Sequence, residues 1–356
     1  MLGFIDRFLT LWIFLAIFLG LVLGIIFPDI ALFWNLFEYK SVNVVLTLCL
    51  ILMMYPPLAK VDYTKLSKVF DSKKVILLSI ILNWFIGPLL MFILAFIFLK
   101  DEPLYMQGVI IIGLARCIAM VVVWSDLAKG DREYTSALVA MNSIFQILFF
   151  STLAYIYLDF LPKLLDQSTL ATSLDIDFST LSKNVLIYLG IPFLMGFITR
   201  TLLLKYKSKQ WYENTFLPKI SPITLITLLV TIIIMCSYKA NEVFHLPLEA
   251  LKIAFVLTLY FIIMFFLTWF ISKKNHLSYP KTCSLCFSAS GNNFELAIII
   301  CIATFGLHSE QAFASIMGPL VEVPILILLV KWALGKNLNS KKRIKPHDSL
   351  QNLSQG

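Results

Sequence analysis

Long apolar runs separated by short polar segments dominate the pattern of this chain. Most runs have about 20 residues, the length that an α-helix needs to cross roughly 30 Å of hydrocarbon at 1.5 Å per residue. The pattern therefore predicts an all-α integral membrane protein with ten spans. We place the spans near residues 9–27, 43–59, 75–99, 105–127, 134–158, 184–204, 217–237, 248–271, 283–306 and 311–334.

Composition supports lipid as the main solvent. Of the 356 residues, 59% are hydrophobic and 14% are charged, and the mean hydropathy is +0.86. A soluble core could not bury so much apolar surface. The first run lacks a small-residue cleavage pattern, so we expect a retained span and not a signal peptide. The six cysteines lie in or beside apolar runs, which argues against a disulfide framework.

The distribution of basic residues predicts the orientation. Ten spans place both termini on one side, and the segments on that side hold 22 of the 29 lysine and arginine residues, against six on the other. Arg116 falls inside a span. The positive-inside rule then predicts a multi-pass protein of the cell (plasma) membrane with both termini in the cytoplasm. This placement explains the net charge of +8 better than nucleic-acid binding does.

The chain divides into two halves. Residues 1–158 hold five spans, 159–183 form the longest connection, and 184–334 hold five more. Five is odd, so the second half must enter the membrane from the opposite side. We therefore predict inverted repeats joined by an extracytoplasmic linker, with substrate bound near the bilayer midplane between the halves. Residues 335–356 form a basic cytoplasmic tail that we expect to be poorly ordered.

A shift of 176 residues gives modest support for the repeat. It places Cys117 on Asn293, Gly130 on Gly306, Asn142 on Gly318 and Gln146 on Glu322.

Two spans in corresponding positions carry unusual polar groups. One contains the sequence 113–120, with Arg116 and Cys117, and the other contains 288–295, with Asn292, Asn293 and Glu295. A charge facing lipid at mid-depth costs about 2.5 to 3.5 kcal/mol on insertion scales. Gly291-Asn292-Asn293 is also a poor helix former. We predict that spans 105–127 and 283–306 are broken and cross, the alternative being polar contacts between ordinary packed helices.

Cys117 has two interpretations. A lone buried cysteine is usually a small apolar residue. Arg116 would favour its thiolate, a soft ligand for thiophilic centres, if an irregular turn let the two side chains converge.

Glu295 and Glu322 are the clearest carboxyl groups inside spans of the second half. Burial favours the protonated form of a carboxyl group, which suits a group that takes up and releases a proton. Glu295 has a structural alternative, as a partner of Arg116.

Further side chains are candidates to line a cavity. Asn142 and Gln146 are four residues apart and share a helix face, and Glu322 precedes Pro324, which should kink its helix. Asn83 and Trp124 are weaker candidates.

No enzyme site is evident. The pair Cys283 and Cys286 lacks the further ligands of a zinc site, and the four histidines are scattered. No hydrolytic triad or phosphate-binding glycine loop appears, and we expect no cofactor.

Five stretches together resemble the arsenite efflux permeases of the bile acid/arsenite/riboflavin transporter superfamily. They are Leu52–Lys60, Gly113–Val121, Trp124–Glu133, Asn292–Ala297 and Gly318–Pro324. One departure is Gly291, where the family pattern leads us to expect serine.

The resemblance implies a ten-span, two-repeat fold that extrudes arsenite, and sometimes antimonite, against an inward flow of protons. It also implies that Cys117 and Glu295 are essential and that Arg116, Asn142, Asn293 and Glu322 line the route. The chemistry is compatible, because one thiolate beside amide and carboxylate groups could bind trivalent arsenic and still release it.

Two other functions remain open from the sequence. A sodium-coupled symporter of organic anions in the same superfamily would use oxygen atoms of Asn292, Asn293 and Glu295 as sodium ligands. An intramembrane enzyme or metal-binding receptor would use Cys117, Glu295 and the Cys283/Cys286 pair.

Overall fold

The structure is a computed structural model that describes residues 9–27, 29–39, 42–65, 73–164, 178–238, 247–307 and 309–344. Nearly all of this is helix. Two strands of two residues each, β1 (Glu38–Tyr39) and β2 (Val42–Asn43), pair antiparallel close to the short helix α3 (Ile30–Asn35). The prediction of a helical protein is confirmed.

Among the residues that the structure describes, six continuous helices are long and apolar enough to cross a membrane. Four of them contain a π-helical turn, the type of irregularity that often marks functional regions of helices. The four helices with a π-helical turn are α6 (Lys73–Ile81), η2 (Leu82–Ile86) and α7 (Gly87–Leu99); α10 (Arg132–Tyr155), η3 (Ile156–Phe160) and α11 (Leu161–Leu164); α13 (Phe178–Val185), η4 (Leu186–Gly190) and α14 (Ile191–Tyr206); and α15 (Lys209–Trp211), η5 (Tyr212–Phe216) and α16 (Leu217–Tyr238). The other two are α18 (Pro247–Lys274) and α21 (Glu310–Ile344).

The remaining helices are shorter. They include α2 (Leu9–Ile26) and α4 (Val44–Lys60), which is followed by the single turn η1 (Tyr63–Lys65). The predicted spans 105–127 and 283–306 are each divided into two half-helices. These are α8 (Pro103–Leu114) and α9 (Met120–Leu127), and α19 (Tyr279–Ser290) and α20 (Phe294–Phe305).

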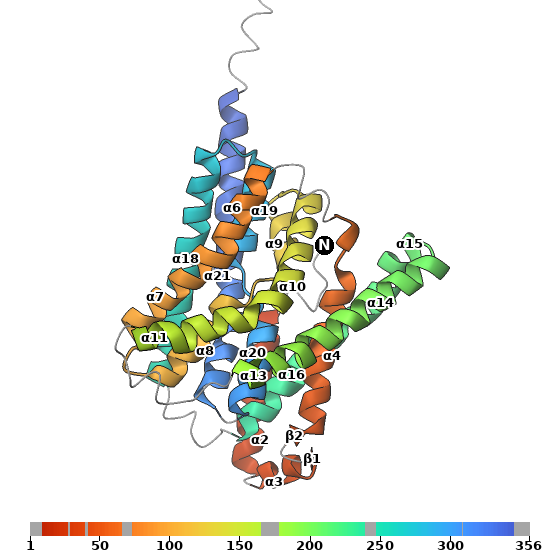
Figure 1. Cartoon of the computed structure of the whole chain (residues 1–356), viewed down its shortest axis with the longest axis vertical. Helices are drawn as coiled ribbons and strands as arrows, with labels where there is room; N and C mark the ends of the chain where they lie inside the picture. Colours follow the sequence, from red (N-terminus) through yellow and green to blue (C-terminus); the bar gives the residue numbers. More distant parts are fainter. Residues whose placement is uncertain are drawn as a thin grey trace, which may run out of the picture.

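The helices form two bundles. In the small bundle, α16 packs against α2 and α4, and α14 packs against the other side of α4 (Figure 1). Close approach is possible because Gly20 of α2 lies against Ile233 and Cys236 of α16, while Gly196 of α14 lies against the backbone of Ala59. Small residues at such contacts let helix backbones come together inside a membrane.

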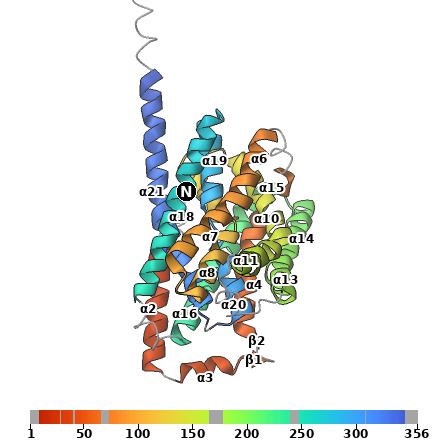
Figure 2. The same cartoon turned by 60° about the vertical axis from the view of Figure 1, so that its left-hand side comes forward.

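The large bundle contains both broken segments. Helix α18 packs against α7, α19 and α21, and α8 packs against α7, α20 and α21 (Figure 2). Half-helices α9 and α19 lie at one end of this bundle, where the Tyr279 hydroxyl donates to the Ala128 carbonyl oxygen at 2.9 Å, and α8 and α20 lie at the other end (Figure 1).

The outer surface of the bundles is apolar. The Phe18 side chain on α2 is 66% exposed and that of Phe270 on α18 is 67% exposed, as are many other large apolar side chains on the long helices. A soluble monomer rarely exposes such a continuous apolar surface. Together with the long apolar helices, this supports a multi-pass membrane protein.

The segments outside the predicted spans differ in part from expectation. Helix α21 continues through Lys336 to Ile344, so the prediction of a poorly ordered tail is wrong for the part of the tail that ends at Ile344. The rest of the predicted tail, 345–356, lies outside the described residues. The first residues of the predicted linker 159–183 belong to the helix that ends at Leu164, and its last residues belong to the helix that starts at Phe178. Residues 165–177 between these helices lie outside the described residues.

Candidate functional site

Both predicted helix breaks are present. Helix α8 ends at Leu114 and α9 begins at Met120, while α19 ends at Ser290 and α20 begins at Phe294. The backbone becomes extended directly after each first half-helix, with ψ of 111° at Ala115 and 144° at Gly291. The prediction that these two spans are interrupted is confirmed.

The two breaks cross and pair with each other. The Asn293 amide donates to the Ala115 carbonyl oxygen at 2.9 Å, and the Cys117 amide donates to the Gly291 carbonyl oxygen at 3.3 Å. Arg116 and Asn292 face each other across this short antiparallel bridge. Each break thereby satisfies backbone groups of the other, which is the condition for irregular backbone inside a membrane protein. The predicted crossing is confirmed.

Arg116 is fully buried and anchored on α18 and α19. One guanidinium nitrogen, Nη1, donates to the Tyr260 hydroxyl at 2.9 Å and to the Ala289 carbonyl oxygen at 3.3 Å. Gly87 makes room for it, because a Cβ atom there would lie 2.6 Å from Nη1. No ion pair joins Arg116 to Glu295, both of which are described, so the structure does not support the interpretation of Glu295 as the partner of Arg116.

Cys117 lies in the first break, at the point where the two breaks meet, and only 3% of its surface is exposed. An ideal Cβ atom built on Gly291 would lie 3.2 Å from the Cys117 Cβ atom and 3.6 Å from the Glu322 Oε1 atom, so the thiol-bearing residue and this carboxylate flank one point. The guanidinium of Arg116 binds Tyr260 of α18 instead, so the condition under which Arg116 would favour the Cys117 thiolate, a convergence of the two side chains, is not observed.

Two side chains of α10 hold the crossing from one side. The Gln146 Nε2 atom donates to the Arg116 carbonyl oxygen at 2.9 Å, and the Asn142 Nδ2 atom donates to the Ser288 hydroxyl at 3.4 Å. Both side chains are fully buried. The structure therefore brings the predicted pair Asn142 and Gln146 to the two breaks.

The two glutamates approach from α20 and α21. Glu322 accepts the Asn292 amide hydrogen at its Oε2 atom, at 3.3 Å, and is 1% exposed. Glu295 is 6% exposed and lies in the first turn of α20, where Asn293 caps the helix by accepting the Leu296 amide hydrogen at 3.1 Å. The positive end of the helix dipole favours a carboxylate at that position.

The two weaker candidates do not join this network. Asn83 in η2 donates to the carbonyl and hydroxyl oxygens of Ser79, one turn earlier in its own helix. Trp124 on α9 is 1% exposed, and its indole nitrogen has no hydrogen-bond partner among the described residues.

Unpaired polar atoms concentrate at the crossing. Buried polar groups in proteins nearly always have partners, so such a cluster indicates a place that binds water or a ligand. Within the described chain, eight buried atoms of the six candidate residues at the crossing have no protein partner: Arg116 Nε and Nη2, Asn142 Oδ1, Gln146 Oε1, Asn292 Oδ1 and Nδ2, Asn293 Nδ2 and Glu322 Oε1.

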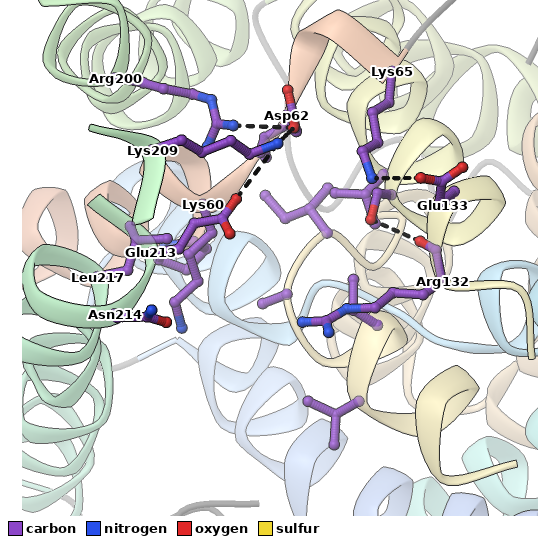
Figure 3. Close-up of a pocket in the computed structure, with 18 residues that line it drawn as sticks. Lys60, Asp62, Lys65, Arg132, Glu133, Arg200, Lys209, Glu213, Asn214 and Leu217 are labelled. Carbon is purple, nitrogen blue, oxygen red and sulfur yellow. Dashed lines mark hydrogen bonds and ion pairs between the residues drawn. The ribbon is translucent and has the colours of Figure 1, made fainter. Parts of the chain in front are cut away.

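A cavity of about 620 Å³ opens between the two bundles and reaches the break of span 105–127. Ile118 and Ala119, the residues that follow Cys117, line its inner wall. Charged side chains line its mouth (Figure 3). These side chains are Lys60, Asp62, Lys65, Arg132, Glu133, Arg200, Lys209 and Glu213.

Ion pairs order this mouth on both walls. Arg200 and Lys209 pair with Asp62 at 3.1 and 3.7 Å, and Lys65 pairs with Glu133 at 3.5 Å across the gap between the bundles (Figure 3). Burial raises the pKa of Asp62, but a hydrogen bond from Thr64 and the charges of Arg200 and Lys209 outweigh burial and hold that pKa below its ordinary value. Asp62 is thus a carboxylate at neutral pH.

Sequence reasoning missed Tyr260 and Gly87, which position Arg116, and the charged mouth. A tyrosine in the middle of the apolar run 248–271 is a polar group that needs a partner, so Tyr260 could have been noticed. The pairing partner itself depends on how the helices pack, and no pattern along the chain gives it.

Paired helix breaks with a buried polar cluster, beside a cavity between two helix bundles, are the arrangement of a secondary transporter. Residues 47–246 match the model of the Sodium Bile acid symporter family. This chain therefore belongs to that family, and it is a transporter and not an enzyme.

Three relatives align over nearly the whole chain. Arsenical-resistance protein Acr3 of Corynebacterium glutamicum is 45% identical over 329 residues, which cover 92% of this chain and 88% of the relative. Arsenical-resistance protein Acr3 of Alkaliphilus metalliredigens is 32% identical, with 93% and 92% covered. An uncharacterized transporter of a Synechocystis species is 31% identical, with 93% and 88% covered.

Replacing Tyr260 by phenylalanine should destabilise the crossing. The change removes the hydroxyl that accepts from Arg116, and a hydrogen bond to a charged group contributes about 1.5–3 kcal/mol. We expect a lower midpoint of thermal unfolding for the purified protein in detergent. Tyr134→Phe is the control, because the buried Tyr134 hydroxyl has no hydrogen-bond partner in the described part of the chain. Equal midpoints for the two variants would contradict the role given to Tyr260.

Proposed function

We propose that this protein extrudes arsenite across the cell membrane in exchange for protons that move inward. The observation that carries the proposal is the placement of one cysteine, Cys117, beside the Glu322 carboxylate at the crossing of two broken helices. Two relatives named as arsenical-resistance proteins, 45% and 32% identical, support it.

The single thiol suits transport of trivalent arsenic. Arsenic is soft and thiophilic, but three thiolates would hold it too tightly for turnover. None of the other five cysteines lies in either break, and in the residues described here they form no cluster of metal ligands. Cys117 would provide one soft contact, and the unpaired amides of Asn142, Asn292 and Asn293 would provide weaker, exchangeable ones.

Proton coupling is assigned to the two carboxyl groups. Glu322 and Glu295 are both buried; Glu322 accepts a hydrogen bond from the Asn292 amide in the second break, and Glu295 lies in the first turn of α20, directly after that break. A proton that binds a carboxyl group here would change the charge beside the thiol. Alternate binding of protons and of arsenite to this cluster gives the exchange that we propose.

We further propose that ten spans form two inverted repeats, 1–158 and 184–334. The bridge at the crossing supports this, because its register matches the shift of 176 residues found in the sequence. Arg116 faces Asn292, its equivalent under that shift. The amide of Cys117 binds the Gly291 carbonyl, and the amide of the equivalent Asn293 binds the carbonyl of Ala115, the equivalent of Gly291.

Side-chain contacts repeat the same relation. Gln146 binds the backbone of Arg116, and its equivalent Glu322 binds the backbone of Asn292, the equivalent of Arg116. Two antiparallel segments that are not related by a repeat would have no reason to show both this backbone register and these matching side-chain contacts. The pattern is what a two-fold axis through the crossing predicts for inverted repeats.

The cavity would face the cytoplasm in this conformation. It opens at the end of the bundle where α9 and α19 lie, and the basic loops gather there, as the positive-inside rule expects of the cytoplasmic side. At the other end, contacts join the bundles. There the Asn184 Nδ2 atom of α13 donates to the Ala303 carbonyl and the Thr304 hydroxyl of α20, at 3.0 and 3.1 Å.

Sodium-coupled import of an organic anion is less well supported. That function would require oxygen atoms of Asn292, Asn293 and Glu295 to converge on a cation. The Asn293 Oδ1 atom instead accepts the Leu296 amide hydrogen and caps α20. This cap uses one of the two lone pairs of the Asn293 oxygen, so it is the similarity to two arsenical-resistance proteins that favours the arsenite proposal.

Transport by everted membrane vesicles tests the proposal. With an acidic lumen, vesicles that contain the native chain should take up arsenite at a rate that does not depend on sodium. Cys117→Ser should lose most of this uptake, because an alcohol replaces the soft ligand. The control is Cys49→Ser, whose half-buried thiol lies on α4 outside the crossing. Uptake of an organic anion driven by sodium alone would reverse the assignment.

Glu322→Gln should uncouple arsenite movement from protons. The amide keeps the shape of the side chain but cannot take up a proton. We expect vesicles with this variant to lose uptake driven by the pH gradient while they still exchange labelled for unlabelled arsenite at equal concentrations. Uptake driven by the gradient at the native rate would show that Glu322 carries no coupled proton.

A further inference from the structure

Gly291 occupies a position where its backbone does not require glycine. It ends α19 with φ of −73° and ψ of 144°, an extended conformation that any residue can adopt. The reason for a glycine must therefore lie in the space around it. That space is fully enclosed, since the residue is buried.

A side chain at this position would enter the gap between two functional groups. An added Cβ atom would lie 3.2 Å from the Cys117 Cβ atom, 3.6 Å from the Glu322 Oε1 atom and 3.0 Å from the Phe287 carbonyl oxygen. The Glu322 Oε1 atom is one of the buried atoms without a protein partner. A methyl group at Gly291 would therefore press against the thiol-bearing residue and lie in contact with an unpaired carboxylate oxygen, at the point that the two groups flank.

A second glycine offers a matched comparison. A Cβ atom on Gly318 of α21 would also approach another Cβ atom at 3.2 Å, that of Phe294, with Ile112 next at 3.8 Å. These neighbours are apolar and carry no candidate ligand. Gly318 therefore reproduces the close approach to another Cβ atom, although not the 3.0 Å contact with a backbone carbonyl, and it does so away from Cys117 and Glu322.

We propose that Gly291 determines the size of the metalloid centre that the transporter accepts. The inference rests on the function proposed above and extends it to selectivity. Antimony is larger than arsenic, and both are trivalent, thiophilic and surrounded by hydroxyl groups. A methyl group at 291 would narrow the gap, so it would exclude antimonite more strongly than arsenite.

One extra methyl or methylene group in a close-fitting pocket changes discrimination by roughly 10- to 200-fold. We expect Gly291→Ala to lower the ratio of antimonite to arsenite uptake in everted vesicles by about tenfold. Gly318→Ala should leave this ratio unchanged even if its overall rates fall. Parallel losses of both substrates in Gly291→Ala, with an unchanged ratio, would overturn the proposal and make Gly291 a packing residue.

Two further arms keep the test decisive. If Gly291→Ala is not recovered as folded protein, Gly291→Ser is used, because its hydroxyl can donate to the unpaired Glu322 oxygen and offset the crowding. Binding is measured separately, as the concentrations of arsenite and antimonite that protect Cys117 from alkylation in purified protein. A changed protection ratio supports the proposal, and an unchanged one overturns it. A native chain that moves and binds neither metalloid would instead overturn the proposed function, and this inference with it.

Discussion

Two interrupted helices can cross inside a membrane only if their freed backbone groups find partners, and here each break supplies the partners of the other. The Asn293 amide binds the Ala115 carbonyl and the Cys117 amide binds the Gly291 carbonyl. Lipid offers no replacement for these hydrogen bonds, so the register of the bridge is fixed. That register places Cys117 against Gly291 and brings the amide of Asn292 to Glu322. The chemistry of the site thus follows from a backbone constraint.

The surrounding bundles explain why this polar cluster can exist. Arg116 would be costly in lipid, but its guanidinium lies between α18 and α19 and binds Tyr260 and Ala289. The small bundle, with its glycine contacts along α2, α4, α14 and α16, forms the second wall of a cavity that reaches the break. Movement of one bundle relative to the other would break the Lys65–Glu133 pair on the cavity side or the Asn184 contacts on the opposite side. Such movement would make the site accessible from one side of the membrane and then from the other, while the crossing stays intact.

Much of this arrangement could be predicted from the sequence, for reasons that are local. Apolar runs of helix length gave the helices, and Gly291-Asn292-Asn293 gave the second break, because these residues form helices poorly. The spacing of Asn142 and Gln146 correctly put both on the face that meets the crossing. The direction of side chains within an irregular turn has no periodicity to predict it, so the sequence could not decide whether Arg116 converges with Cys117 or pairs with Glu295. In the structure its guanidinium binds Tyr260 and Ala289. The partners Tyr260 and Gly87 come from other helices and depend on packing.

The site requires Cys117 and Glu322 to flank the same point at the crossing, and this proximity can be measured by cross-linking. In a chain whose other five cysteines are replaced, Glu322→Cys is combined with Cys117, and a protease site is inserted in the segment 165–177. The account predicts that Hg²⁺ joins the two cysteines, so that the cleaved halves stay together on a denaturing gel. Glu310→Cys, twelve residues earlier on the same helix and so about 18 Å away along its axis, should give no link. Halves that separate for Glu322→Cys, although each cysteine alone reacts with a thiol reagent, would contradict the account.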